Sequence, residues 1–203
     1  MSVITISRQF GAGGKTLGEM IAKELDYVFH DDLIIQEIAD KAKVSTDSVI
    51  SIERTAGSKL SKLISTMLSR SYIERIVGAD KGYIDEKTYV ELLKTIIVEF
   101  AQQDNVVLLG RGGQYVLQDF KGAYHILLVA KWEDRIKFMQ QFYDFSDTKA
   151  SKAVKQGDTR RSNLYKKLGR EDYNQPYLYH LVLNMSRISL EQALREIVVL
   201  VQS

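Results

Sequence analysis

The chain has 203 residues, of which 45% are hydrophobic and 27% are charged, so its length and composition fit a single globular domain over residues 1–203. The 28 basic residues nearly balance the 26 acidic ones, which argues against a partner such as nucleic acid or a membrane surface being bound by bulk charge. The absence of cysteine excludes disulfides and thiolate metal sites, and no apolar run reaches the roughly 20 residues that span a bilayer. The N-terminus also has no long apolar segment of a signal peptide, so we expect a cytoplasmic protein.

Short apolar segments and helical segments alternate along the first half of the chain. Residues 3–6 (VITI) and 27–30 (YVFH) are expected to be buried strands because β-branched and aromatic residues dominate them. Residues 14–25 between them have the spacing of an amphipathic helix. Residues 33–102 follow as a long helical block with polar breaks near 43–46 and 78–82.

The second half continues the alternation. Residues 106–109 (VVLL), 124–129 (YHILLV) and 181–183 (LVL) are the remaining strand candidates. Residues 131–170 are expected to be one helix, and Ser189 is a good N-cap for a final helix over 189–201. Short apolar strands separated by helices predict an α/β fold with a parallel five-stranded sheet covered on both faces.

One glycine-rich segment stands where the first strand passes into the first helix. It is residues 7–16, SRQFGAGGKT. Strand, glycine turn and helix start together direct unpaired backbone N–H groups and the positive end of the helix dipole at one point. This arrangement is typical of a site that binds a phosphate group.

Three interpretations of this segment compete. The phosphate-loop motif G-x-x-x-x-G-K-S/T explains Gly14, Lys15 and Thr16, but its first glycine is replaced by Gln9. The dinucleotide motif G-x-G-x-x-G matches Gly11 and Gly13 and fails at its third glycine, although acidic residues follow about 20 positions later. A tight turn that binds nothing is the third possibility. We favour the phosphate loop because only that motif accounts for the lysine and the hydroxyl residue.

The chain also resembles the cytidylate kinase-like family, a branch of the nucleoside monophosphate kinases. The opening ITISRQFGAGGKTLG is similar to the phosphate loop of that branch, and DYNQPYLYHLVLNMSRISLEQA is similar to its C-terminal signature. The segments FHDDLI and LLGRGG match the ends of its second and third strands. The resemblance thus runs in order through nearly the whole chain.

The resemblance implies a three-layer P-loop kinase fold with a helical monophosphate-binding insert at 33–102 and a lid near 140–170. It further implies ATP-dependent phosphoryl transfer to a nucleoside monophosphate, with CMP or dCMP as the first candidate and Mg²⁺ as the cofactor. It carries no prediction of the oligomeric state. The chain departs from the family at the loop lysine: when Gly11, Ala12 and Gly13 are aligned, Gly14 stands at the lysine position and Lys15 follows one step later.

Phosphoryl transfer requires positive charge around the moving group more than covalent chemistry. The catalytic candidates are therefore mostly cationic. Lys15 and Arg8 flank the loop, and the segment VKQGDTRRSNLYKKLGR contains Asp158, Arg160 and Arg161. This segment is by itself typical of a solvated charged face. The resemblance assigns it to the lid, with Arg161 before Arg160 as the residue that closes over the phosphates.

ATP is expected to lie along the loop, and the resemblance adds two residues beyond it. Thr16 is the expected Mg²⁺ ligand. Arg135 follows the strand 124–129 in an A-x-x-E-x-R pattern, and without the resemblance it would be interpreted as an exposed arginine paired with Glu133 or Asp134. Asn184 ends the last strand and either lines the adenine site or caps the final helix. The expected ATP-binding residues are Gly11, Ala12, Gly13, Gly14, Lys15, Thr16, Arg135 and Asn184.

The acceptor is expected at the ends of the second and third strands. Arg111 lies between glycines directly after a buried strand, where a guanidinium can hold a phosphate with two hydrogen bonds. Asp31 and Asp32 are balanced between ligand contact and capping the next helix, and the resemblance favours Asp31 as the contact. Tyrosines in the insert (Tyr72, Tyr83 and Tyr89) can stack on a base, although a core or surface position is the commoner one.

Two other classes of function stay open from the sequence. A nucleotide-binding regulator without turnover would keep the loop and lose the reaction. A dinucleotide-binding oxidoreductase would use the same glycines for NAD(H).

Overall fold

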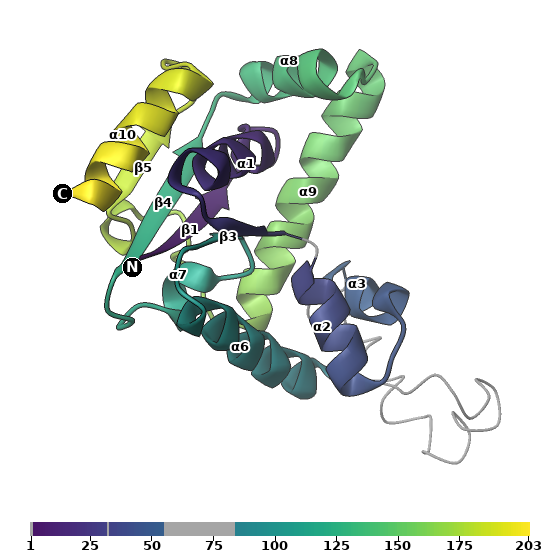
Figure 1. The fold of residues 1–203 in the computed structure, drawn as a ribbon. Helices are drawn as coiled ribbons and strands as arrows, with labels where there is room; N and C mark the ends of the chain where they lie inside the picture. Colours follow the sequence, from purple (N-terminus) through teal and green to yellow (C-terminus); the bar gives the residue numbers. More distant parts are fainter. Residues whose placement is uncertain (1, 32, 55–83) are drawn as a thin grey trace.

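A computed structural model of the chain describes residues 2–31, 33–54 and 84–203. Its five strands form one parallel sheet in the order β2-β3-β1-β4-β5 (Figure 1). The strands are β1 (Val3–Arg8), β2 (Val28–His30), β3 (Val106–Leu109), β4 (Ala123–Val129) and β5 (Leu181–Asn184). The prediction of a parallel five-stranded α/β fold is therefore confirmed. Asp32, Tyr72 and Tyr83 lie outside the described residues.

The helices connect and cover these strands. Their bounds are α1 (Gly14–Leu25), α2 (Leu33–Ala42), α3 (Thr46–Arg54), α6 (Glu86–Gln102), α7 (Gly113–Val116), α8 (Trp132–Tyr143), α9 (Asp147–Lys167) and α10 (Leu190–Gln202), with a short 3₁₀ turn at Pro176–Leu178. No helix within the described ranges has the length and apolar character to cross a bilayer.

The sheet separates two apolar clusters, because neighbouring residues of a strand point to opposite faces. On β3, Val106 and Leu108 pack with α2 and α6, whereas Val107 and Leu109 pack with α1 and α10. The molecule thus has three layers, with α1 and α10 on one face and α6 and α7 on the other (Figure 1). β1 lies between β3 and β4 at the centre, so the segment that follows it emerges in the middle of the sheet edge.

The prediction of one helix over 131–170 is wrong. α8 ends before Asp144, whose φ of 51° is left-handed, and α9 begins after Ser146, whose hydroxyl accepts a hydrogen bond from the backbone N–H of Lys149. The apolar periodicity does not show this break, although a serine N-cap is a local signal for it. The break turns the chain, so that α9 runs back along the molecule toward α6 (Figure 1).

The predicted break near 43–46 is confirmed, because α2 and α3 meet there and Lys43 adopts a φ of 53°. The short helix α7 was not predicted. Its N-cap is Gly112, at a φ of 77°, and it follows directly from the glycines after β3. The described parts of the region 33–102 are helical, as expected.

Candidate active site

The glycine loop connects β1 to the first turn of α1. Gly11 and Gly13 have φ angles of 85° and 82°, which L-residues with a side chain rarely adopt, and Gly13 is the N-cap of α1. A Cβ on Gly11 would also lie 3.0 Å from the carbonyl oxygen of Arg135. The glycines therefore allow the loop backbone to pack closely against its neighbours. Its N–H groups lie at the positive end of α1, a helix of 12 residues.

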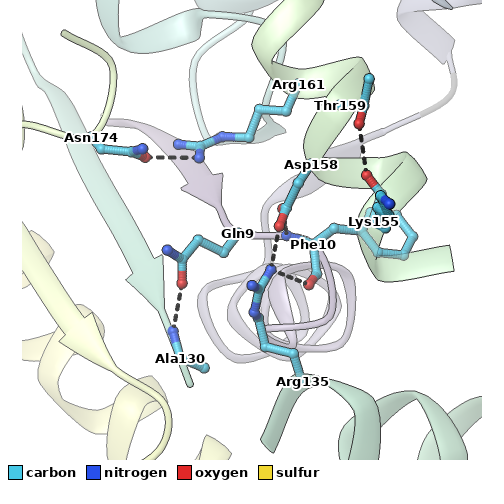
Figure 2. Close-up of polar contacts among 9 residues, drawn as sticks. All are labelled: Gln9, Phe10, Ala130, Arg135, Lys155, Asp158, Thr159, Arg161 and Asn174. Carbon is cyan, nitrogen blue, oxygen red and sulfur yellow. Dashed lines mark hydrogen bonds and ion pairs between the residues drawn. The ribbon is translucent and has the colours of Figure 1, made fainter. Parts of the chain in front are cut away.

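Gln9, which breaks the strict phosphate-loop motif, fixes the loop to β4. Its side-chain oxygen accepts a hydrogen bond of 2.9 Å from the backbone N–H of Ala130 (Figure 2). The backbone N–H of Gln9 donates to the carbonyl of Leu128. Its carbonyl accepts from the N–H of Ala12. A glycine at this position could not make the side-chain bond.

The start of the loop is also fixed to helices α8 and α9. Asp158 accepts a 3.0 Å hydrogen bond from the backbone N–H of Phe10 and forms a 2.7 Å ion pair with Arg135. Arg135 donates a second bond, of 3.2 Å, to the carbonyl of Phe10 (Figure 2). Arg135 is only 7% exposed, so it is not the solvent-facing arginine that the bare sequence suggests.

Phe10 packs against Gly157 so closely that a Cβ at that position would overlap the ring. Together with Asp158, this contact holds α9 directly on the loop. Arg160 extends along the same side, with its guanidinium carbon 5.9 Å from the centre of the Phe10 ring.

Arg161 is anchored to the core of the molecule. Its guanidinium donates hydrogen bonds to the hydroxyl of Ser7 on β1, at 3.1 Å, and to the side chain of Asn174, at 2.8 Å. It also lies over the ring of Tyr173. The structure therefore has α9 docked on β1 and the loop, whereas the resemblance implied a lid that swings.

The two cations of the loop point in different directions. The amine of Lys15 lies 3.6 Å from a carboxylate oxygen of Asp31, and Lys15 faces a cavity next to α2. Arg8 passes over Gly14, where a Cβ would lie 2.8 Å from Arg8 Cγ, and its guanidinium reaches Gly110. Burial lowers the pKa of Arg8 from its usual value, and Asp31 partly opposes this.

A cavity of about 330 Å³, which we call the arginine cavity, opens beside the loop toward β3 and α3. It is rich in charged side chains, although apolar residues such as Ile35 and Leu164 complete its wall. Its charged residues are Arg8, Arg54, Arg111, Arg160, Arg161, Asp31 and Glu53. Five cations against two carboxylates give this cavity an excess of positive charge, which suits an anionic ligand.

Arg111 lies at the inner wall of the arginine cavity. Its side chain donates to the backbone carbonyl of Asp31 at 2.6 Å and to the carboxylate of Glu53 at 3.1 Å. Burial is the largest single influence on the pKa of Arg111 and lowers it. The Coulombic attractions of Glu53, Tyr89 and Asp31, together with the hydrogen bond to Glu53, outweigh burial, so the pKa of Arg111 is raised. Tyr89 donates to the same carboxylate and is fully buried, so it is a core residue and does not stack on a base.

A second cavity, of about 260 Å³, lies on the other side of the loop, and we call it the apolar cavity. Gly11 and Ala12 form one edge of it. Side chains from α8 and from the segment after β5 form the rest, among them Phe138, Phe142, Met185, Ile188 and Leu190. Its size and surface fit a flat aromatic base.

Sequence reasoning did not find Phe138 or Met185, because an apolar residue on a helix or after a strand is indistinguishable from a core residue. Asn184, which it did name, does not line the apolar cavity. The side-chain oxygen of Asn184 accepts from the N–H of Ser186, whose hydroxyl accepts from the N–H of Lys131. Asn184 therefore orders the segment that carries Met185.

An Mg²⁺ ion held at the loop would need few protein ligands. Within the described ranges no cluster of three or more His, Cys, Asp or Glu residues is arranged to hold a metal. In phosphoryl-transfer sites Mg²⁺ is held mainly by substrate phosphates and water, with one or two protein oxygens. Thr16, half-buried in the first turn of α1, offers a hydroxyl at the loop and fits that requirement.

Comparison with solved structures supports the fold. An uncharacterized protein from Eubacterium ventriosum superposes with a TM-score of 0.68 at 13% identity, covering 100% of this chain and 99% of that chain. A shikimate kinase from Bacteroides thetaiotaomicron superposes with a TM-score of 0.50, also at 13% identity, over 100% and 99% of the two chains. At these identities the likeness shows a P-loop kinase fold and nothing finer. No curated protein matches the chain at a significant level.

The family is shown by the sequence itself. The family model described as the cytidylate kinase-like family matches residues 3–187, which include the glycine loop, Arg111, Asp158 and Asn184. The match covers most of the 203 residues and contains every side chain named above in the arginine cavity. The chain therefore belongs to the cytidylate kinase-like family.

Proposed function

We propose that this protein transfers the γ-phosphoryl group of ATP to a nucleoside monophosphate, with CMP or dCMP as the first candidate acceptor. One observation carries the proposal. The glycine loop lies between an apolar cavity that suits a base and an arginine cavity that suits an anion. A phosphoryl donor and a phosphorylated acceptor placed in these two cavities would meet at the loop.

The donor would place its adenine in the apolar cavity and its phosphates along the loop. The backbone N–H groups of Gly11, Ala12, Gly13 and Gly14 are the expected donors to the phosphate oxygens. Mg²⁺ bound to ATP would take the Thr16 hydroxyl as a ligand and would supply positive charge between the β- and γ-phosphates. Arg135 and Asp158 would keep Phe10, and with it the loop, in place.

The acceptor would place its phosphate against Arg111. The guanidinium is held by Glu53 and by the Asp31 carbonyl, so it is oriented before the acceptor arrives. The carboxylate of Asp31 lies next to both Arg111 and Lys15, where it can accept a hydrogen bond from a sugar or base. Arg160 and Arg161 would cover the phosphates from α9.

In the reaction, an oxygen of the acceptor phosphate bonds to the γ-phosphorus as the bond from that phosphorus to the β–γ bridging oxygen breaks. ADP leaves, and the acceptor becomes a nucleoside diphosphate. The protein supplies positioning and positive charge around the transferred group, and no covalent intermediate is needed. Phe10 and Leu164 line the arginine cavity, where with both substrates bound they would limit the access of water that competes with the acceptor.

A thermal-shift panel tests the proposal. Each nucleoside monophosphate is added alone and together with ATP and Mg²⁺, and NAD(H) is a separate arm. A ligand that binds only the folded protein stabilises it by mass action and so raises the melting temperature. At a ligand concentration of 100 times Kd, the free energy of unfolding increases by about 2.7 kcal/mol. We expect ATP and one monophosphate to raise it together. If ATP shifts the melt and no monophosphate does, the acceptor assignment is wrong, and a shift by NAD(H) alone would contradict the kinase assignment.

One observation favours a second candidate, a nucleotide-binding regulator without turnover. Gly14 stands at the family's lysine position, and the neighbouring Lys15 lies against Asp31. A protein that had lost the reaction would bind ATP and CMP without producing ADP. A coupled assay for ADP, run at saturating ATP and CMP, separates the two candidates.

A further inference from the structure

Arg8 and Gly14 are exchanged relative to the phosphate-loop motif. When Gly13 is placed at the sixth position of G-x-x-x-x-G-K-S/T, the first glycine of the motif falls on Arg8 and its lysine falls on Gly14. The chain thus has a cation where the motif has glycine and glycine where the motif has its cation. In this alignment Lys15 falls on the S/T position and Thr16 follows it, so Arg8 and Lys15 are the two cations that flank the glycines.

The structure gives the exchange a physical basis. The Arg8 side chain lies across Gly14, and a Cβ on Gly14 would be 2.8 Å from its Cγ and 3.2 Å from its Cδ. A lysine at position 14 therefore cannot coexist with Arg8 in this conformation. The far end of Arg8 is accommodated by a second glycine, because a Cβ on Gly110 would overlap Arg8 Nη1.

The partners of the cavity's arginines differ. Arg111 is held by Glu53 and the Asp31 carbonyl, and Arg161 by Ser7 and Asn174. The side chain of Arg8, by contrast, makes no hydrogen bond or ion pair with any residue in 2–31, 33–54 or 84–203, although the charge of Asp31 acts on it. An arginine stays charged at all ordinary pH values.

Arg8 is also largely removed from solvent. Burial is the largest influence on its pKa, and the carboxylate of Asp31 only partly compensates. A charged group in that condition is unfavourable unless an anion completes its surroundings. The guanidinium lines the arginine cavity, so an anionic ligand there would reach it.

The path of the Arg8 side chain indicates which anion would bind to its guanidinium. Its stem begins at the end of β1 and crosses the first residue of α1, where ATP phosphates would bind, and its guanidinium ends at Gly110, next to Arg111. It therefore extends from the donor side of the loop to the acceptor side. Lys15 faces the separate cavity by α2.

We propose that Arg8 is the catalytic cation that contacts the transferred phosphoryl group in place of a loop lysine, and that Gly14 and Gly110 make room for it. This inference rests on the proposed kinase function. During the transfer Arg8 keeps its proton and donates N–H bonds to the oxygens of the γ-phosphoryl as it moves from ADP to the acceptor phosphate.

The first experiment compares Arg8→Ala, Arg8→Lys and Lys15→Ala, with Lys23→Ala on the exposed end of α1 as the neutral control. Turnover is measured with ATP and the best acceptor. We expect Arg8→Ala to lower kcat by about 10²–10³-fold, as the loss of one preorganised donor does in other enzymes, and Lys15→Ala to lower it less than tenfold. Arg8→Lys should fall between Arg8→Ala and the parent. A larger loss for Lys15→Ala, or a change confined to the acceptor KM in Arg8→Ala, overturns the proposal.

The second experiment moves the cation back to the motif position. Arg8→Gly is compared with the double variant Arg8→Gly/Gly14→Lys. The double variant should recover at least about tenfold of the lost kcat, since it restores a charge at the phosphates. Gly14→Lys alone should lower both kcat and the melting temperature, because Arg8 still occupies the space. No recovery in the double variant contradicts the exchange.

The third experiment separates this inference from the proposed function. Calorimetry with ATP, ADP and Mg²⁺ does not depend on turnover. In Arg8→Ala the affinity for ATP should fall at least about tenfold and the affinity for ADP less than threefold, because the γ-phosphoryl is the group lost between them. If the parent protein turns over no acceptor, the kinase function fails while this ATP–ADP difference still supports Arg8. Equal losses for ATP and ADP overturn the inference on Arg8.

Discussion

The two cavities beside the glycine loop differ in the chemistry of their walls. The arginine cavity presents five guanidinium groups and two carboxylates drawn from β1, α3, α9 and the residues after β2 and β3. The apolar cavity presents rings and aliphatic chains from α8 and the segment after β5, with Asp134 and Glu191 as its charged side chains. The arginine cavity therefore suits a negatively charged group, and the apolar cavity offers contact surface to a flat group.

Under the proposed function, this difference determines how selective each side of the site would be. A charged cavity with oriented donors discriminates strongly, because a ligand that lacks the matching anion leaves buried groups without partners. An apolar cavity discriminates weakly, since most bases offer it a similar face. We therefore expect a strict requirement for a phosphate on the acceptor and a permissive choice of the donor base. Variants in the two cavities should therefore affect different kinetic constants.

The largest effect is expected on the acceptor side. Arg111→Ala should lower kcat/KM for the acceptor by about 10³-fold, because truncating a buried, charge-assisted contact costs about 2–5 kcal/mol. The Kd for ATP should change less than threefold, as measured by calorimetry. Since the variant leaves Glu53 without its cation, the double variant Arg111→Ala/Glu53→Gln is the control for stability. A loss of ATP affinity as large as the loss for the acceptor would remove the distinction between the cavities.

A smaller effect is expected on the donor side. Phe138 stacks on Phe142 with ring centres 4.3 Å apart and lines the apolar cavity. Phe138→Ala should raise the KM for ATP about 10–100-fold, the range of stacking on a base, and leave the acceptor KM unchanged. Tyr143→Ala, on the same helix but outside the cavity, is the matched control. An unchanged KM for ATP in Phe138→Ala would show that the base binds elsewhere.

A third effect is expected where the two sides meet. Asp158 on α9 joins Phe10 of the loop to Arg135 of α8. Asp158→Asn retains an acceptor for the Phe10 N–H but removes the charge that faces a buried guanidinium, so we expect a kcat about tenfold lower and a reduced melting temperature. Both KM values should change less than threefold. Steady-state kinetics with each substrate varied in turn would reveal a one-sided change, which would assign Asp158 to a single cavity.

The smallest effect is expected for Asn184→Ala. This side chain orders the segment after β5 through Ser186 and does not line the apolar cavity. Its loss should make the position of Met185 less well defined and so raise the KM for ATP two- to threefold, without changing kcat. A rise above tenfold in the same assay would indicate direct contact with ATP, as the resemblance first suggested.

Local patterns in the sequence were enough for the parts of the site that lie on one continuous segment. The strand, the turn and the helix of residues 3–25 follow from β-branched residues, a cluster of glycines and helical spacing, and the structure has them there. The resemblance assigned Asp31 and Arg111 to the acceptor and Asp158 to a lid. In the structure Asp31 lies next to Arg111 and Lys15, and Asp158 contacts Phe10 of the loop. These predictions rest on residue patterns and on their order along the chain, so they do not require knowing how distant segments pack together.

The remaining features depend on contacts between distant segments. Nothing near Gly14 or Gly110 in the sequence indicates that Arg8 runs past both glycines. The pair of Arg111 and Glu53 joins residues 58 positions apart, and Arg161 reaches Ser7 across 154 positions. The break at Asp144 was missed because a left-handed residue between two helices leaves the apolar period nearly unchanged.

The most direct test of the account is a single-turnover experiment with ATP labelled at its γ-phosphate. Excess protein is mixed with labelled ATP, Mg²⁺ and each nucleoside monophosphate in turn, and the products are separated at short times. We expect the label to move to one nucleoside diphosphate, with CMP the first candidate to accept it, before inorganic phosphate accumulates. Label that appears only in inorganic phosphate, or that stays in ATP with every acceptor, would contradict the proposed function.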